Sequence, residues 1–221
     1  MPDEQQLHGV DGAATALIQL YQQAHNRVRN MLQVALESGA LGTATYREQT
    51  LAGIEAEMKR LGTSTRGAPG VVVDTGYRAA VHAVDMTTDT GRLLGGFSWG
   101  GVHVGSAEVL SKALTDTLDE SRQTVGREAR DLFRQVVVQQ NAISVAAGGD
   151  RDDPARLAVQ DLLAHGVTCF RDKAGRRWSL DNYCSMATRT TAREAASVAT
   201  ENRMVQGGQD LVTISRHRSE T

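Results

Sequence analysis

The chain has 221 residues, with 26 acidic and 24 basic side chains and a formal net charge of −2. This near balance creates no global field that would require nucleic acid or a membrane surface as the partner. Its length suits one large domain or two small ones. No apolar run approaches the roughly 20 residues that cross a bilayer, and the N-terminus shows no signal peptide. Aromatic residues make up only 4% of the chain, which favours closely packed helices built from Ala, Val and Leu.

A heptad pattern near the N-terminus predicts the first long helix. Its apolar positions alternate at spacings of three and four over about four heptads; they are Leu7, Val10, Ala14, Leu17, Tyr21, Ala24, Val28, Met31 and Ala35. Residues 37–42 end this helix, and Thr45 with Glu48 predicts a capping box for a second one. Either the two helices form an antiparallel hairpin that buries its own seams, or the seam pairs with another subunit or a partner helix.

The central part of the chain is predicted to be helical on both sides of a glycine-rich loop. Residues 62–70 are expected to form a flexible joint because they hold Gly, Ser, Thr and Pro. Helical spacing of apolar residues favours a helix over 71–86, and residues 92–106 form the loop. A further helical region follows over 106–147, with Gly126 as a possible break.

The C-terminal part has a different pattern. Asp153 followed by Pro154 is a helix start signal. Within 167–180, two short strand candidates flank a turn from Asp172 to Gly175. Ser179 then caps a long helix that runs to about residue 205, and DLVTIS (210–215) is a last strand candidate.

The predicted β-hairpin needs support from the helix that follows it, because an isolated hairpin is marginal in water. Phe170, Trp178 and Tyr183 are expected to form a small core there. The predicted fold is therefore mainly α: an N-terminal helical hairpin or bundle, with a small C-terminal α+β module in which a β-hairpin packs on a long helix. The expected divisions are 1–65 (helical hairpin), 66–152 (helices with the glycine-rich loop) and 153–221 (hairpin and helix).

Motifs for catalysis, metals and cofactors are weak. The histidines are scattered without zinc spacing, GxSxG does not occur, and GxxxxGK[ST] is missing before the helix that follows the glycine-rich loop. We therefore expect no catalytic, metal or cofactor site, and a mobile loop or assembly contact at 92–106. Cys169 and Cys184 are expected as free thiols, and Cys184 as a packed side chain rather than an activated thiolate.

A local basic patch extends over residues 169–195, where six basic and three acidic side chains occur in a chain of net negative charge. Such a patch can contact phosphates or an acidic protein surface. Alternatively, the arginines only form the solvent-exposed surface of the hairpin and its helix. The basic side chains are Arg171, Lys173, Arg176, Arg177, Arg189 and Arg193. Arg189 lies between small residues in mid-helix, so we expect it to tie its helix to nearby carbonyl groups.

The same stretch resembles the phage minor capsid protein 2 family. The likeness covers residues 168–217 and consists of a D-x-x-G-R-x-W turn followed by a Y-x-x-M-x-x-R-T helix. The matching residues are Asp172, Gly175, Arg176 or Arg177, Trp178, Tyr183, Met186, Arg189 and Thr190. The helix also looks like that of MuF-type head-morphogenesis proteins, and the N-terminal helix is similar in character to the family's helical start.

The resemblance implies a non-catalytic structural protein of the virion, present in few copies in the head interior or at the portal vertex, and in the host cytoplasm during assembly. The implied partners are the portal or major capsid protein and packaged DNA. Self-association through the N-terminal seam is the alternative that the heptad pattern leaves open. Family members usually continue beyond the SRH segment (215–217), so this is either a shortened member or a chain without its tail. Two alternatives stay open: a DNA-binding protein that uses the patch at 171–193, and an enzyme or toxin-related domain that uses the glycine-rich loop.

Overall fold

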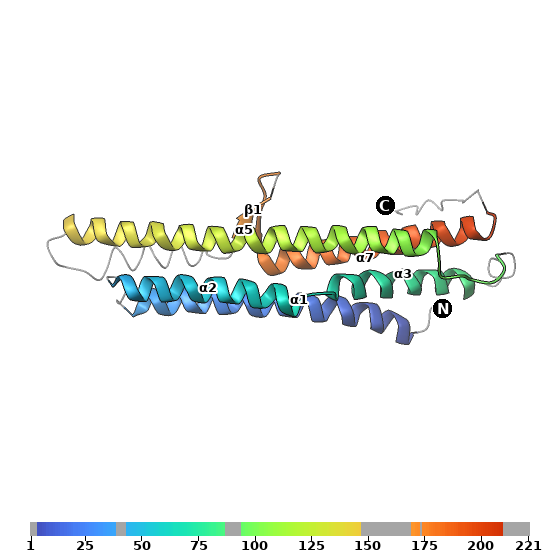
Figure 1. Ribbon diagram of the computed structural model, residues 1–221, viewed down its shortest axis with the longest axis horizontal. Coiled ribbons are helices and arrows are strands. Elements are labelled where there is room, and N and C mark those ends of the chain that lie inside the picture. The colour runs from blue at the N-terminus through green and yellow to red at the C-terminus, as the bar shows by residue number, and fades with distance from the viewer. Residues whose placement is uncertain (1–3, 39–42, 87–93, 147–168, 173, 210–221) are drawn as a thin grey trace, which may run out of the picture.

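The computed structural model describes residues 4–38, 43–86, 94–146, 169–172 and 174–209. These residues form an elongated, mainly α-helical bundle with one β-hairpin, as the sequence predicts (Figure 1). The elements are α1 (Glu4–Glu37), α2 (Ala44–Ser64), α3 (Ala68–Met86), α5 (Val102–Ala146), β1 (Cys169–Arg171), β2 (Arg177–Ser179) and α7 (Leu180–Gln206).

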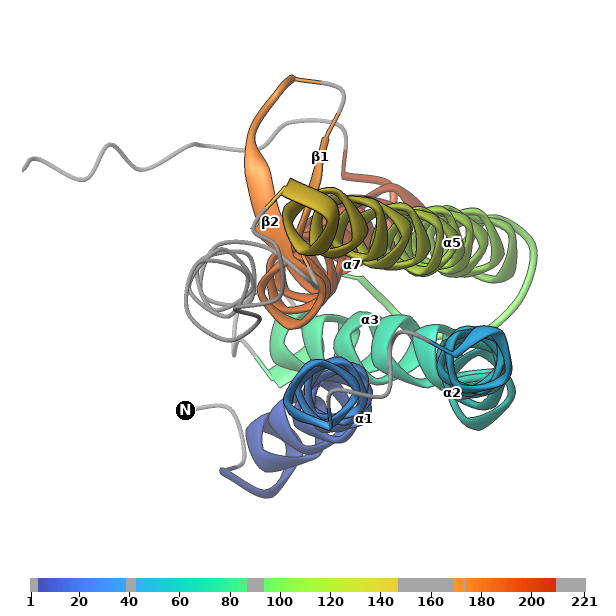
Figure 2. The same ribbon diagram turned by 90° about the vertical axis from the view of Figure 1, so that its left-hand side faces the viewer.

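The helices run along the long axis of the molecule. α1 leads to one end, α2 returns beside it, and α3 continues toward the other end (Figure 1). α5 then runs back along nearly the whole length. α7 lies against α5, α3 and α1 in the half of the bundle that α3 occupies (Figures 1 and 2).

The predicted heptad seam of α1 is largely confirmed and lies inside the bundle. Of its predicted members, five are buried and Ala14 is half-buried, while the side chains of Leu7 and Val10 lie outside the described part. The buried ones are Leu17, Tyr21, Ala24, Val28 and Ala35. Leu32 is buried where Met31 was predicted, and Met31 is only partly covered. The seam belongs to a large core shared by α1, α2, α3, α5, β1 and α7. The seam from Leu17 onward is therefore covered within one chain, and its use between chains stays a prediction.

The capping box predicted for α2 is wrong. The N-cap is Thr43, whose extended backbone (φ −94°, ψ 134°) precedes the first helical residue, and it makes no side-chain cap hydrogen bond. Thr45 is already helical, so its side chain is not placed at the boundary where a capping box forms.

Two glycine-containing segments are more ordered than predicted. The joint expected over 62–70 is a turn of only Thr65–Gly67, in which Thr65 donates to the Leu61 carbonyl at 2.8 Å and Gly67 has a φ of +82°. Gly126 does not break α5. It is buried where an added Cβ would lie 3.2 Å from Met58 Cγ. This glycine therefore permits close approach of α2 and α5.

The predicted helix over 71–86 is confirmed as α3, and the glycine-rich loop is shorter than expected because α5 already begins at Val102. A second, smaller core lies where α3, α5 and α7 meet. It consists of Val73, Tyr77, Val81, Ala107, Leu110, Ala195 and Ala199.

Some predictions lie outside the described residues, namely the helix starting at Asp153 and the strand at 210–215. The expected division at 65/66 falls in the turn between α2 and α3. The expected division at 152/153 lies outside the described residues. None of the helices in the described part of the chain has the length and apolar character needed to cross a membrane.

Candidate functional site at the two ends of α7

The predicted β-hairpin stands out from the bundle beside the start of α7 (Figure 2). β1 and β2 pair antiparallel, with Phe170 opposite Trp178 and Arg171 opposite Arg177. In the turn, the Gly175 N–H donates to the Asp172 carbonyl at 2.9 Å, and the φ of Gly175 is +78°. The turn residues predicted from the sequence are confirmed, since this φ is one that glycine adopts at little cost.

Asp172 organises the hairpin. Its carboxylate accepts hydrogen bonds from the backbone N–H of Ala174 (2.9 Å) and Arg176 (2.8 Å), from Arg176 Nε (2.8 Å) and from Trp178 Nε1 (3.0 Å). Desolvation acts to raise the pKa of Asp172, but the hydrogen bonds from Trp178 and Arg176 outweigh it and lower the pKa to about 2. This carboxylate is a fixed acceptor at neutral pH.

The three aromatic side chains form the small core expected between hairpin and helix. Tyr183 makes edge-on contacts with Phe170 (ring centroids 5.0 Å apart) and Trp178 (5.8 Å). Leu180 and Cys184 are fully buried nearby. Burial raises the pKa of the Cys184 thiol to about 12, and neither Cys184 nor Cys169 is in a disulfide. Cys184 is thus a packed, protonated side chain, as predicted.

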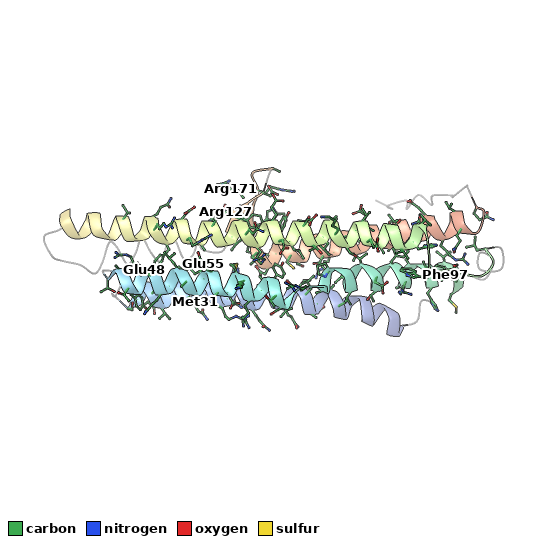
Figure 3. The ribbon with its side chains drawn as sticks, viewed as in Figure 1. Met31, Glu48, Glu55, Phe97, Arg127 and Arg171 are labelled. Carbon is green, nitrogen blue, oxygen red and sulfur yellow. The ribbon has the colours of Figure 1, made fainter. Side chains whose placement is uncertain are left out.

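Glu128 on α5 lies beside the hairpin. It accepts a hydrogen bond from the backbone of Arg171, and the charges of Arg127, Arg171 and Arg177 are close enough to stabilise its ionised form. Burial nevertheless dominates and raises the pKa of Glu128. Arg127 on α5 and Arg171 on the hairpin both act on Glu128, so the basic patch extends from the hairpin onto α5 (Figure 3).

The remaining motif residues lie on the solvent side of α7. Met186 and Thr190 contact each other one turn apart, with Thr190 Oγ1 3.9 Å from Met186 Sδ. Arg189 and Arg193 are exposed. Within the described part of the chain, Arg189 donates to no carbonyl group, so it does not make the tie that the sequence suggested. Its place beside small residues leaves it free to extend into solvent.

Arg203, at the other end of α7, makes the tie instead. It is 1% exposed. Its Nε donates to Asp85 Oδ1 at 2.6 Å, and its two terminal nitrogens donate to the carbonyl groups of Gly95 (2.7 Å) and Leu94 (3.4 Å). The planar guanidinium therefore joins α7, the end of α3 and the glycine-rich loop, a use for which arginine is well suited.

The loop is further held by aromatic contacts. Trp99 stacks on His103 (interplanar angle 17°) and meets the edge of Tyr77, while Phe97 packs against His103 (Figure 3 labels Phe97). The Tyr77 hydroxyl is 3.1 Å from His103 Nδ1 and accepts from Asn202 at 2.7 Å.

Backbone groups at the start of α5 also face the loop. The backbone N–H of His103 donates to the Gly100 carbonyl at 3.2 Å. This N–H group is therefore paired within the chain.

Arg203 and its partners were missed by sequence reasoning. The signal that could have found them is periodicity, because Arg203 continues the buried row of Ala195 and Ala199 at intervals of four residues. A cation in an apolar row must be paired when buried. The described residues contain no group of three or more His, Cys, Asp or Glu side chains able to hold a metal ion.

The fold and this site define an elongated helical protein with a projecting, arginine-bearing hairpin. The model of the family described as Phage minor capsid protein 2 matches residues 71–221, which include most of α3 and all of α5, the hairpin and α7. The chain therefore belongs to the phage minor capsid protein 2 family, with a structural role in the capsid and a location in the virion. The helices α1 and α2 lie outside the match. Comparisons with curated proteins and with solved structures gave no match.

Proposed function

We propose that this protein acts in phage head assembly beside the portal as a non-catalytic minor head protein. In this proposal the hairpin and the first turns of α7 dock on the portal or the major capsid protein, in the head interior or at the portal vertex. The observation that carries it is the projection of a rigid, arginine-bearing hairpin from a chain of this family (Figure 2).

The rigidity of the hairpin supports a docking role. Asp172 fixes the turn and the Trp178 ring, so the hairpin has little freedom left to lose on binding. Arginine and aromatic side chains are enriched at protein interfaces. Arg171, Arg177 and Arg189 are exposed, and therefore available to a partner.

A non-catalytic role agrees with how the reactive groups are held. The Cys184 thiol is buried and protonated, Asp172 is saturated with donors, and the His103 side chain near the start of α5 is buried against Phe97 and Trp99. These features also weigh against an enzyme or toxin-related domain built on the glycine-rich loop.

The test is incorporation into particles of the phage that encodes the protein. The variant Arg177→Glu/Arg189→Glu reverses two exposed charges without touching the Asp172–Arg176 pair. We expect at least about tenfold less of this variant in purified heads, and normal amounts of Arg29→Glu, an exposed control on α1. Absence of the wild-type protein from mature and immature particles would refute the proposal, as would normal incorporation of the double variant.

Packaged DNA is a second candidate partner, favoured by the same exposed arginines. Binding of this kind would appear as a salt-dependent shift of double-stranded DNA that is lost in Arg176→Ala/Arg177→Ala. A shift that persists in this variant would remove the hairpin from that role.

A further inference from the structure

A groove with a volume of about 730 Å³ lies between α2 and α5. Its walls carry Lys59 and Glu55 from α2 and Arg127 and Arg130 from α5, and the bottom is formed by Tyr21, Met58 and Leu118. The bottom residues are members of the large core. The groove therefore combines an apolar bottom with a polar, mostly basic rim.

The groove has unbalanced positive charge. Its described lining includes five basic side chains and two acidic ones. Both acids are already paired, Glu55 with Arg130 at 2.6 Å and Asp119 with Arg122 at 3.1 Å. The other three cations, Lys59, Arg66 and Arg127, are exposed. Within the described part of the chain Lys59 and Arg66 form no ion pair, and the acidic group near Arg127 is Glu128, which is not part of the groove lining. A negatively charged ligand would complement them.

The walls of the groove are held apart at a fixed spacing. Arg122 crosses from α5 to donate to the Met58 carbonyl on α2 at 3.0 Å, and the Arg130–Glu55 pair makes a second connection. Gly62 faces this crossing, and a Cβ there would lie 3.0 Å from Arg122 Cζ. The groove is thus preformed, which lowers the cost of binding.

The shape selects among negatively charged partners. The volume falls within the range of roughly 300–1,000 Å³ typical of ligand pockets. A DNA duplex presents a convex and uniformly polar backbone, which would meet the rim cations but leave the apolar bottom unfilled. An amphipathic helix can place apolar side chains at the bottom and carboxylates at the rim.

We infer that the α2–α5 groove binds an acidic amphipathic helix of a partner protein, whose carboxylates pair with Lys59, Arg66 and Arg127. One wall of the groove is α2, which lies outside the family match, and the other wall is α5, which lies within it. The inference goes beyond the proposed docking of the β-hairpin and does not depend on it.

The experiment measures binding of a labelled peptide to the purified full-length chain by fluorescence anisotropy. The probe is an amphipathic helix of about 14 residues, close to four turns, with Leu on one face and Glu on the other. A scrambled peptide of the same composition, a short DNA duplex and inorganic phosphate serve as competitors. The variant is Lys59→Glu/Arg127→Glu, and the matched charge-reversal control outside the groove is Arg29→Glu.

We expect the amphipathic peptide to bind the wild-type chain and to lose at least about tenfold in affinity with the double variant, but less than about twofold with Arg29→Glu. Added salt should weaken binding, since the rim cations are exposed. Circular dichroism checks the fold of each variant. If the double variant does not fold, Lys59→Gln/Arg127→Gln replaces it, and this variant should also bind the amphipathic peptide more weakly than the wild-type chain.

Four results would overturn the inference: no binding of the amphipathic peptide, equal binding of the scrambled one, affinity unchanged in the double variant, or displacement by phosphate at equal concentration. Preferential binding of the duplex through Lys59 and Arg127 would instead assign the groove to nucleic acid. Particle incorporation tests the proposed function separately, so either idea can fail alone.

Discussion

The two ends of α7 use arginine in opposite ways. At the start of the helix, Arg171, Arg176 and Arg177 surround a turn whose hydrogen bonds all lie within a few residues of Asp172. At the end, Arg203 contacts groups that lie 118, 109 and 108 positions earlier in the chain. The first arrangement is local and faces solvent, whereas the second is long-range and buried.

This difference implies that the two ends contribute differently to stability and to function. Exposed ion pairs contribute little to stability, so the arginines of the hairpin are available for recognition. Removing one partner of a buried ion pair is far more damaging, because the remaining groups keep their desolvation cost without compensation. The C-terminal end of α7 should therefore respond to substitution as a structural joint.

Replacement of Arg203 by Met should have the largest effect. It leaves Asp85 and the carbonyl groups of Leu94 and Gly95 without their donor, and we expect a loss of about 3 kcal/mol in the free energy of unfolding. Urea unfolding followed by circular dichroism measures this loss. Arg193→Met, at an exposed position on the same helix, should change stability by less than about 0.5 kcal/mol. Equal effects of the two changes would contradict the contrast between buried and exposed arginines.

Gly207→Ala should also destabilise the C-terminal end, by about 2 kcal/mol. An added Cβ at Gly207 would lie 2.9 Å from Leu94 Cα and would also meet the Leu94 side chain, so the loop has to move. The control is Gly105→Ala, a helical position with no neighbouring atom within 4 Å of the added Cβ, where a small stabilisation is expected. Thermal unfolding of both variants gives the comparison, and a neutral Gly207→Ala would show that the loop is not closely packed there.

Acid should loosen the hairpin through protonation of Asp172. The pKa of Asp172 is lowered from 3.8 to about 2, so the stabilisation by its ionised form is complete above about pH 4 and is lost as the pH falls through 2. Nuclear magnetic resonance of the Trp178 indole N–H, which donates to Asp172, should follow this titration.

The Trp99 indole serves as the internal reference for this titration, because Trp99 lies in the loop at the opposite end of α7. In Asp172→Asn the low-pH step of Trp178 should disappear. A step that persists in this variant would assign the change to another group.

The smallest effect is expected for Arg189→Ala. Because Arg189 is exposed and donates to no carbonyl group among the described residues, its removal should change the free energy of unfolding by less than about 0.5 kcal/mol. Denaturant unfolding measures the change. A loss above 1 kcal/mol would restore the structural tie that the sequence suggested.

The sequence predicts those parts of the fold whose causes are local. The heptad pattern places α1, and the Asp172–Gly175 turn with Ser179 places the hairpin and the start of α7. Predictions that depended on a single glycine were less reliable. At Gly126 the missing side chain serves the approach of Met58, and a one-dimensional pattern does not distinguish such a contact from a break.

The candidate site was predictable only at the hairpin. Its residues lie close together in the sequence, so their spacing carries the family resemblance and the turn chemistry together. The Arg203 joint and the α2–α5 groove are assembled from segments far apart in the sequence. A local sequence pattern does not predict which distant segments contact one another. The misplaced role of Arg189 has the same origin, because a mid-helix arginine on the exposed face and one on the buried face differ only in helical phase.

α5 gives the molecule a fixed length. Its 45 residues form one uninterrupted helix, which at 1.5 Å per residue extends over roughly 65 Å. Both cores and the groove include residues of this single element. A partner bound in the groove and another bound at the glycine-rich loop would therefore be kept at a constant separation, and the protein would act as a rigid spacer between them.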